Sequence, residues 1–347
     1  MRIIKRISVR EVKENMVLDD DVLDSNGKVL FAAGIRLTSD YVRRLAKLNI
    51  PFISVREPIK ENREYAVVRG IAGAAVRRRL IKGVEEAFSG KGRLLKQLPY
   101  LRQYIKQVIR ELSGTEQVLL YLEELQTSSD YLFIHSVNVC LFAIALGKAM
   151  ALNEEEISVL GLGALLHDLG KTQIPRNILD KKGPLTPEEF ALVRGHVIIG
   201  GEILSRDCQL DERVLFIALQ HHERYDGAGY PHSLKFEQIH PLARIVSVAD
   251  VYDALTTDRV YRPQIESSTA IQLILGGSRT YFDPGVLKTF KRIAVPYGIG
   301  CSVKLNNGLS GAVLRLNSGD LGRPVIWTLK GAVNLLHEPE LQIIKAM

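Results

Sequence analysis

The sequence predicts a mainly α protein, with a bundle of helices at its centre and a small module at each end. Three observations support this fold class. Long apolar-rich stretches that suit helices follow one another through residues 126–293. The two ends of the chain instead place turn dipeptides between short apolar runs. Strands and helices do not alternate regularly, so a parallel sheet is not expected.

The two terminal modules are predicted from turn signals. In residues 1–57, Asn26-Gly27 lies between two apolar runs, which is the strongest short-range signal for a β-hairpin. Thr38 or Ser39 then suits the N-cap of a short amphipathic helix. Residues 294–347 have the turns and short apolar stretches of an antiparallel sheet. We therefore expect a small α+β module before the bundle and a small β module after it.

Residues 58–125 are basic and polar, and they are expected to form a helical linker. Gly90–Gly92 and Pro99 interrupt the helical pattern, so we expect two or three helices here. The run Arg77-Arg78-Arg79 is interpreted as a solvated helix face, with contact to an anion as the alternative.

Within residues 126–293, several helices have recognisable ends. The stretch from Ser129 to Met150 is expected to form one apolar helix, and TPEEFALVRGHVIIGGEIL is expected to form another. Thr186, with Glu189 three residues later, resembles a capping box. Pro187 suits the first helical position.

Length and charge indicate the class of partner. A chain of 347 residues predicts two or three domains. The net charge of +7 and the pI near 9.2 suit an anionic partner such as a nucleotide, a nucleic acid or an acidic membrane surface. Basic and aromatic residues are not interleaved, so nucleic acid is not the expected partner.

Cysteines and apolar runs indicate the compartment. The three cysteines, Cys140, Cys208 and Cys301, are isolated and lack any CxxC spacing. A disulfide framework or a zinc ribbon is therefore not expected, and a reducing cytosol fits. No long apolar core follows the basic N-terminus, and the longest apolar run, around 139–147, is too short to span a bilayer. We expect a cytoplasmic protein without a signal peptide or membrane insertion.

The helical region also holds a set of residues suited to binding metal ions, and it includes five of the eight histidines. Several have mostly apolar neighbours, where an unpaired imidazole or carboxylate is costly and a metal ion would explain its presence. Imidazole with carboxylate suits zinc, manganese, iron or nickel, and the absence of thiolates disfavours copper(I) and iron–sulfur clusters. The set is His135, His167, Asp168, His196, His221, His222 and Asp250.

These residue types favour a dinuclear centre. A carboxylate such as Asp168 can bridge two cations. Two cations about 3.5–4 Å apart can generate hydroxide and hold a phosphoryl group during in-line displacement. Any single histidine is more often a hydrogen-bonded core or surface residue, but the set as a whole indicates phosphodiester chemistry.

Four segments resemble the HD-GYP group of HD-domain phosphohydrolases, which are bacterial signalling phosphodiesterases that degrade cyclic di-GMP. They are HDLGK at 167–171, RGH at 194–196, HHERYDGAGYP at 221–231 and ADVYDALTTDRVYRP at 249–263. An HD dipeptide alone is a weak signal, whereas the four segments in this order are highly specific. The resemblance covers roughly residues 126–293 and implies that they form an HD-type helical bundle.

The resemblance implies metal-ligand roles for the whole set of seven residues, with Asp168 as the bridge. It implies two divalent ions, with iron or manganese as the metal. Lys171 lies four residues after His167 and is on the same helical face if the helix persists to it. Its counterpart in the family points at the substrate phosphate, so Lys171 is expected to stabilise transition-state charge or to deliver a proton.

The resemblance also implies substrate contacts. Gly229 would let the backbone bend close to the ligand, and Tyr230, with the proline after it, would form a stiff wall beside a guanine or ribose. A packed loop aromatic is the alternative for Tyr230. Arg259 and Arg262 match family positions that grip substrate phosphates, with pairing to an acid such as Asp258 as the alternative.

One position departs from a pattern found in some members of the family. They carry a glutamate one helical turn before the first histidine, and it helps to bind a third metal. Here that position is Tyr131, beside Asp130. Two metals are therefore favoured, and a third site completed by solvent or by Asp130 stays open.

The function implied by the resemblance is hydrolysis of cyclic di-GMP by hydroxide held between two metals. The product would be the linear dinucleotide pGpG, with further hydrolysis to GMP left open. Three alternatives remain: another cyclic or linear nucleotide as substrate, a catalytically weak sensor of cyclic dinucleotides, and a phosphatase for mononucleotides. The N-terminal module resembles one that often precedes such catalytic units, so regulation or homodimerisation is expected of it.

Overall fold

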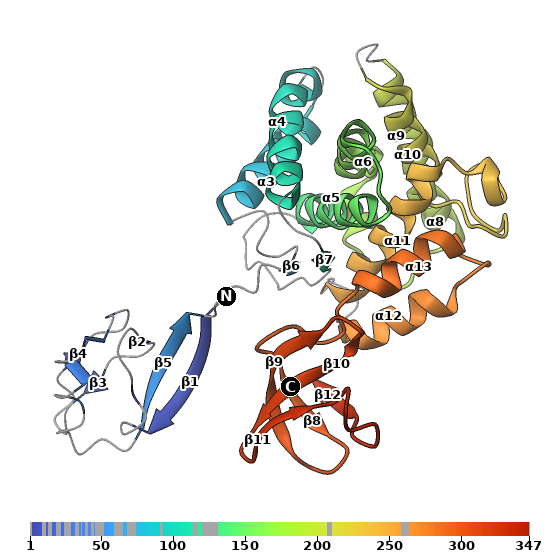
Figure 1. Ribbon diagram of the computed structural model, residues 1–347. Coiled ribbons are helices and arrows are strands. Elements are labelled where there is room, and N and C mark those ends of the chain that lie inside the picture. Colours follow the sequence, from blue (N-terminus) through green and yellow to red (C-terminus); the bar gives the residue numbers. More distant parts are fainter. Residues whose placement is uncertain are drawn as a thin grey trace. The chain divides into compact units, whose positions relative to one another are not determined.

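Figure 1 shows the computed structural model of the chain. The structure describes residues 2–8, 12, 16–18, 22–23, 29–31, 35, 37–38, 41–42, 45, 52–58, 65–67, 74–90, 93–113, 117–119, 131–206, 210–257 and 264–346. The chain forms two compact units, Met1–Arg63 and Glu64–Met347.

The first unit contains two small antiparallel sheets. Strands β1 (Arg2–Ser8), β5 (Phe52–Pro58) and β2 (Val17–Leu18) form one sheet in the order β1-β5-β2. Strands β3 (Val22–Leu23) and β4 (Val29–Phe31) pair with each other. This antiparallel pair flanks Asn26-Gly27 and agrees with the expected hairpin, although the turn itself lies outside the described residues.

A short helical stretch completes this unit. Tyr41 N–H donates to Thr38 Oγ1 at 3.4 Å, and Val42 N–H donates to the Thr38 carbonyl at 2.9 Å. Thr38 therefore occupies the expected N-cap. Leu37 and Leu45 are buried in the core of the unit, together with Leu18.

The second unit is built mainly from helices that share one hydrophobic core. Its longer helices are α3 (Ala74–Phe88), α4 (Arg93–Ser113), α5 (Tyr131–Ala149), α6 (Glu154–Leu166), α8 (Pro187–Arg194), α9 (His196–Ser205), α10 (Glu212–Gln220), α11 (Pro241–Thr256), α12 (Ser267–Gly276) and α13 (Pro284–Ile293). Shorter elements are α7 (Arg176–Leu179) and the 3-10 helices η2 (Leu169–Gln173) and η3 (Phe236–Gln238). The mainly α prediction is confirmed.

Helix α5 is central to the bundle. It packs against α3, α6, α11 and α13, among which it lies in Figure 1. Within the described part of the chain, α5 alone is long and apolar enough to cross a membrane. Of its most apolar stretch of 18 residues, 72% is buried in the protein. The apolar run expected to be too short for a bilayer thus belongs to a helix of 19 residues. Such burial is typical of a core helix, and cytoplasmic localisation stays a prediction.

The C-terminal segment forms the expected small β module. Its strands are β8 (Ser302–Leu305), β9 (Ser310–Asn317), β10 (Asp320–Thr328), β11 (Gly331–Asn334) and β12 (Ile343–Ala346). They form a five-stranded antiparallel sheet in the order β11-β10-β9-β8-β12. Alternating residues such as Val303 and Leu305 face its core.

Three local expectations need correction. Pro99 lies inside α4 rather than breaking it, because its ring is on the exposed side, where water can bind the carbonyl left without a partner. The segment beginning at Thr186 forms α8 and α9, which meet at Gly195, rather than one helix. Strands β6 (Tyr65–Val67) and β7 (Gln117–Leu119) form a parallel pair in the segment expected to be wholly helical.

The capping box expected at Thr186 is confirmed. Thr186 N–H donates to Glu189 Oε2 at 2.7 Å, and Glu189 N–H donates to Thr186 Oγ1 at 3.2 Å. Pro187 occupies the first turn of α8. The division of the chain into four segments stays a prediction, but α3 and α4 contribute to the same core as α5 and α6.

Candidate metal centre

The seven residues expected to bind metal lie together inside the bundle. They come from α5, the junction of α6 with η2, the start of α9, the end of α10, and α11. In each of two groups, one ligand atom from every residue lies within 4.8 Å of the others. One group is His135, His167 and Asp250, and the other is Asp168, His196, His221 and His222.

A close backbone approach brings two of these elements together. A Cβ built on Gly170 would overlap the carbonyl oxygen of His196. Glycine at this position therefore lets η2 lie directly against the start of α9. The contact places Asp168, just before η2, beside His196.

Asp168 lies between the two groups. Its Oδ2 is 3.7 Å from His135 Nε2 and 3.4 Å from His167 Nε2. Its Oδ1 is 3.3 Å from His196 Nε2 and 3.8 Å from His221 Nε2. One carboxylate thus presents a different oxygen to each group, as a bridging ligand must.

Asp250 contacts both groups from α11. Its Oδ1 is 3.1 Å from His135 Nε2, and its Oδ2 is 3.9 Å from His222 Nδ1. Burial would raise the pKa of Asp250, but the close contact with His135 and the other neighbouring imidazoles hold that pKa well below its ordinary value. The carboxylate is therefore ionised at neutral pH.

Backbone hydrogen bonds fix the ring orientation of three histidines. The Nδ1 atoms of His167, His196 and His221 each lie within hydrogen-bond distance of the carbonyl oxygen three residues earlier, at 2.7, 2.6 and 3.0 Å. A carbonyl only accepts, so Nδ1 must carry the proton. A ring that carries only this proton directs the lone pair of Nε2 into the cluster, which is the arrangement of a metal-binding histidine.

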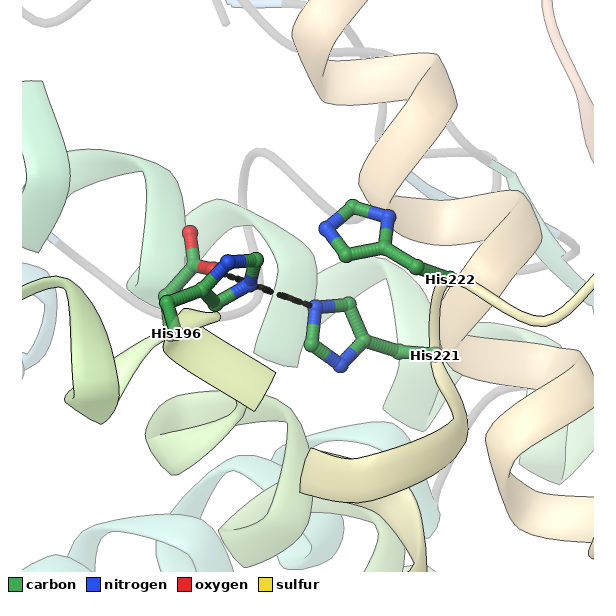
Figure 2. Close-up of side chains that lie close together, drawn as sticks. His196, His221 and His222 are labelled. Carbon is green, nitrogen blue, oxygen red and sulfur yellow. Dashed lines mark hydrogen bonds and ion pairs between the residues drawn. The ribbon is translucent and has the colours of Figure 1, made fainter. Parts of the chain in front are cut away.

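These lone pairs point at one another. Figure 2 shows the rings of His196 and His221 facing each other, and their Nε2 atoms are 3.4 Å apart. Two ligands of one tetrahedral metal, each at about 2.0–2.1 Å, have nitrogens about 3.3 Å apart. Within the described residues, buried His135 Nε2, His167 Nε2 and Asp168 Oδ1 also lack a hydrogen-bond partner. The donor set therefore fits metal ions.

Burial sets the charge of two rings. Burial and then neighbouring imidazoles hold the pKa of His221 well below its ordinary value, and burial lowers the pKa of His222 to about 3. Both rings are neutral at pH 7, which is the form that binds metal. For His135, burial would lower the pKa, but the carboxylates of Asp250 and Asp253 outweigh it and raise the pKa to about 9.

Lys171 lies beside the cluster, as expected, but on a different element. Helix α6 ends at Leu166, so the α-helix does not persist to Lys171, which lies in η2. Lys171 Nζ donates to Asp168 Oδ2 at 2.6 Å. Burial would raise the pKa of Asp168, but His167 and Lys171 hold it well below its ordinary value.

Tyr131 occupies the position where some family members carry a third-metal glutamate. Its ring stacks on His135, with centroids 5.5 Å apart and an interplanar angle of 15°. An aromatic ring thus packs on a candidate ligand where a carboxylate would be needed. Asp130, the alternative ligand, lies outside the described residues.

Tyr230 lies beside the cluster in a stack of side chains. Its ring stacks on His222, with centroids 4.9 Å apart. The guanidinium carbon of Arg194 lies 4.2 Å from the centroid of the Tyr230 ring. Among the described residues, Arg194 has no hydrogen-bonding or carboxylate partner. Sequence reasoning missed Arg194, although it lies two residues before His196 in the quoted RGH segment.

The loop after the paired histidines is held in shape by its own chain. A Cβ on Gly229 would overlap the backbone of residues 222–224, so glycine lets the loop return onto itself. The sequence analysis had instead explained Gly229 by a close approach of the backbone to a ligand. Buried Glu223, also missed, accepts from the N–H groups of His232 and Leu234 at 2.7 and 3.1 Å.

The two arginines expected to grip phosphate, Arg259 and Arg262, lie outside the described residues, as does Asp258. Their roles stay predictions.

The chain is similar to several known proteins. Residues 118–286 match the model of the HD domain family. The chain is 41% identical over 206 residues to the cyclic di-GMP phosphodiesterase PA4108 of Pseudomonas aeruginosa, covering 59% of this chain and 50% of the relative. It is 42% identical over 138 residues to the cyclic di-GMP phosphodiesterase response regulator RpfG of Xanthomonas campestris, covering 40% of this chain and 36% of the relative.

A third relative is named for another nucleotide. The 3'3'-cGAMP-specific phosphodiesterase 2 of Vibrio cholerae is 34% identical over 155 residues, covering 44% of this chain and 30% of the relative. The chain thus spans half or less of the length of these curated relatives.

A solved structure shares the fold. Bd1817, an HDG"Y"P protein from Bdellovibrio bacteriovorus, matches with a TM-score of 0.52 at 19% identity, covering 82% of this chain and 97% of that one. The family model covers the helices that carry the histidine and aspartate cluster. Residues 118–286, which contain the four segments that resemble the HD-GYP group, thus match the HD domain family.

Proposed function

We propose that this protein is a metal-dependent phosphodiesterase that hydrolyses cyclic di-GMP to pGpG, with further hydrolysis to GMP left open. The observation that carries the proposal is the position of Asp168, which presents one oxygen to each of two histidine groups. Relatives named as cyclic di-GMP phosphodiesterases support the choice of substrate.

Two divalent ions, with iron or manganese as the metal, suit this imidazole and carboxylate set. When bound, they would supply an activated water and neutralise charge on the phosphate. His135, His167 and Asp250 would hold one ion, His196, His221 and His222 the other, and Asp168 both. The Tyr131 ring on His135 supports two ions rather than three.

Other side chains would position the substrate. Lys171 would place its ammonium next to the bridging carboxylate, where it can stabilise transition-state charge or protonate the leaving oxygen. Tyr230 offers a flat ring beside the cluster for a base or ribose, and Arg194 adds a positive charge above it. Phosphate contacts from Arg259 and Arg262 remain part of the proposal.

Turnover of cyclic di-GMP tests the proposal. Purified protein would be loaded anaerobically with Fe(II) or with Mn(II), incubated with cyclic di-GMP, and its products resolved by chromatography. Asp168→Ala removes both bridging oxygens, and Asp180→Ala, at an exposed aspartate, is the matched control. We expect pGpG or GMP from the natural chain and from Asp180→Ala, but not from Asp168→Ala.

Parallel reactions separate this function from its alternatives. Turnover of 3'3'-cGAMP, but not of cyclic di-GMP, would assign the same centre to another cyclic dinucleotide. Tight binding of cyclic di-GMP without turnover, at measured metal occupancy, would indicate a sensor. Regulation or homodimerisation through the N-terminal module stays a prediction, and chromatography of the full chain with and without nucleotide would test dimerisation.

A further inference from the structure

The arginine run on α3 does not form the uniformly solvated face expected from sequence. Arg78 and Arg79 are exposed, whereas Arg77 is only 4% exposed. Among the side chains whose burial the structure describes, Arg77 is the one buried lysine or arginine. A buried guanidinium is costly unless its donors are used, so its partners are informative.

Arg77 begins a chain of side-chain hydrogen bonds that ends at the candidate metal centre. Arg77 Nη2 donates to Asn138 Oδ1 at 2.9 Å, and Asn138 Nδ2 donates to Asp253 Oδ1 at 2.8 Å. Asp253 Oδ2 in turn accepts from His135 Nδ1 at 2.6 Å. All four side chains are 5% exposed or less.

The donors and acceptors fix the orientation of each side chain in this series of hydrogen bonds. Arginine only donates, so it specifies that the Asn138 oxygen faces Arg77 and the Asn138 amino group faces Asp253. The opposite orientation of the amide would place its oxygen against the Asp253 carboxylate. Asp253, held in this way, accepts from His135 Nδ1 and leaves His135 Nε2 facing Asp168 and Asp250.

We propose that Arg77 is a positioning residue of the metal centre, which orients His135 as a ligand through Asn138 and Asp253. The inference rests on the proposed metal binding of His135. Arg77 lies on α3, outside residues 118–286 that match the HD domain model. A helix interpreted from sequence as part of a linker would thus complete the support of the centre.

Metal affinity of the full chain tests this inference without relying on turnover. Mn(II) would be titrated calorimetrically into the metal-free natural chain, Arg77→Met and Arg78→Met, with circular dichroism as a check on folding. Loss of the direct hydrogen-bond partner of a ligand typically costs about 10–100-fold in metal affinity, and Arg77 acts on that partner, Asp253, through Asn138. We therefore expect at least one binding step of Arg77→Met to weaken about tenfold or more, while the exposed-site control Arg78→Met matches the natural chain.

A double-mutant cycle shows whether Arg77 affects metal affinity through this series of hydrogen bonds or through packing in general. Asn138→Ser interrupts the same series of hydrogen bonds but keeps the Arg77 guanidinium. If the two residues act only through this series, the double variant should bind Mn(II) no more weakly than the single variant with the lower affinity. A folded Arg77→Met with the affinity of Arg78→Met overturns the inference. If Arg77→Met does not fold, Asn138→Ser alone decides, and unchanged Mn(II) affinity there overturns it.

The positioning role of Arg77 and the proposed substrate can be rejected separately. A natural chain that binds Mn(II) but leaves cyclic di-GMP intact would reject the proposed substrate, while weakened binding in Arg77→Met would still support the positioning role. A natural chain that does not bind metal would reject both.

Discussion

Lys171 Nζ lies 2.6 Å from Asp168 Oδ2, the same carboxylate oxygen that faces His135 and His167. A lysine and a metal ion on this side of the cluster would therefore share one oxygen and repel each other. The arrangement favours a lysine that acts on the phosphate at some cost to metal affinity.

Lys171→Met is predicted to separate these two effects. Removing the ammonium should tighten Mn(II) binding by roughly two- to tenfold, since a competing cation is gone. It should lower kcat for cyclic di-GMP by roughly a hundredfold or more, since charge stabilisation or proton delivery is lost. Calorimetry and steady-state kinetics measure the two effects, with exposed Lys182→Met as the control. Unchanged kcat would remove Lys171 from the reaction.

Arg194→Met is predicted to raise KM for cyclic di-GMP roughly tenfold with little change in kcat. The guanidinium over Tyr230 has no hydrogen-bond or ion-pair partner among the described residues, so its N–H donors are available to a phosphate of the bound nucleotide. Initial rates over a range of substrate concentrations separate the two constants, and exposed Arg206→Met serves as the control. Normal KM with weakened Mn(II) binding would show instead that Arg194 supports the metal centre.

Gly170→Ala is predicted to destabilise the fold by about 1–3 kcal/mol, as overpacking does. The added methyl would overlap the carbonyl of His196, so η2 and α9 must separate. Urea unfolding of the metal-free protein measures the loss, and Mn(II) affinity should fall as well. Gly183→Ala is the matched control, because a Cβ there has no atom within 4 Å. Equal stability of the two variants would contradict the close packing of η2 on α9.

The metal-free protein is predicted to lose stability on acidification. The pKa of His222 is lowered from 6.5 to about 3, and that of His221 is also lowered. Between about pH 6.5 and 3 the unfolded chain therefore binds protons that the folded chain does not, and stability falls as the pH falls. For His135, with its pKa raised to about 9, the contribution is complete below about pH 6.5 and is lost as the pH rises toward 9.

Urea unfolding between pH 5 and 8, after removal of metal with a chelator, checks these opposite signs. His222→Gln should flatten the acid side of the profile and leave the alkaline side unchanged. A profile without slope between pH 7 and 5 would show that the buried rings are protonated in the folded state.

Features set by local chemistry were predictable from the sequence. The capping box of Thr186 and Glu189 depends on residues three apart, and the helix forms where the pattern places it. The convergence of seven ligand candidates could be predicted because imidazoles and carboxylates in apolar surroundings require partners, and because the quoted segments resemble a known family.

Features set by packing were not predictable in this way. Three adjacent arginines look alike in sequence. Arg77 alone of the three is buried, because its side of α3 packs against α5. Its place next to Val76 and three residues before Leu80, both buried, was the available signal. Pro99 was expected to break a helix because its tolerance depends on facing solvent, which composition does not show.

The loop that carries Tyr230 takes its shape from Glu223 and from the return of Gly229 onto residues 222–224. Neither Glu223 nor Gly229 belongs to the histidine and aspartate cluster. Natural variation or protein engineering can therefore change exposed loop positions such as Ala228 without replacing a member of the cluster. On the proposed function, the choice of nucleotide and the binding of metal would then be encoded by separate sets of residues.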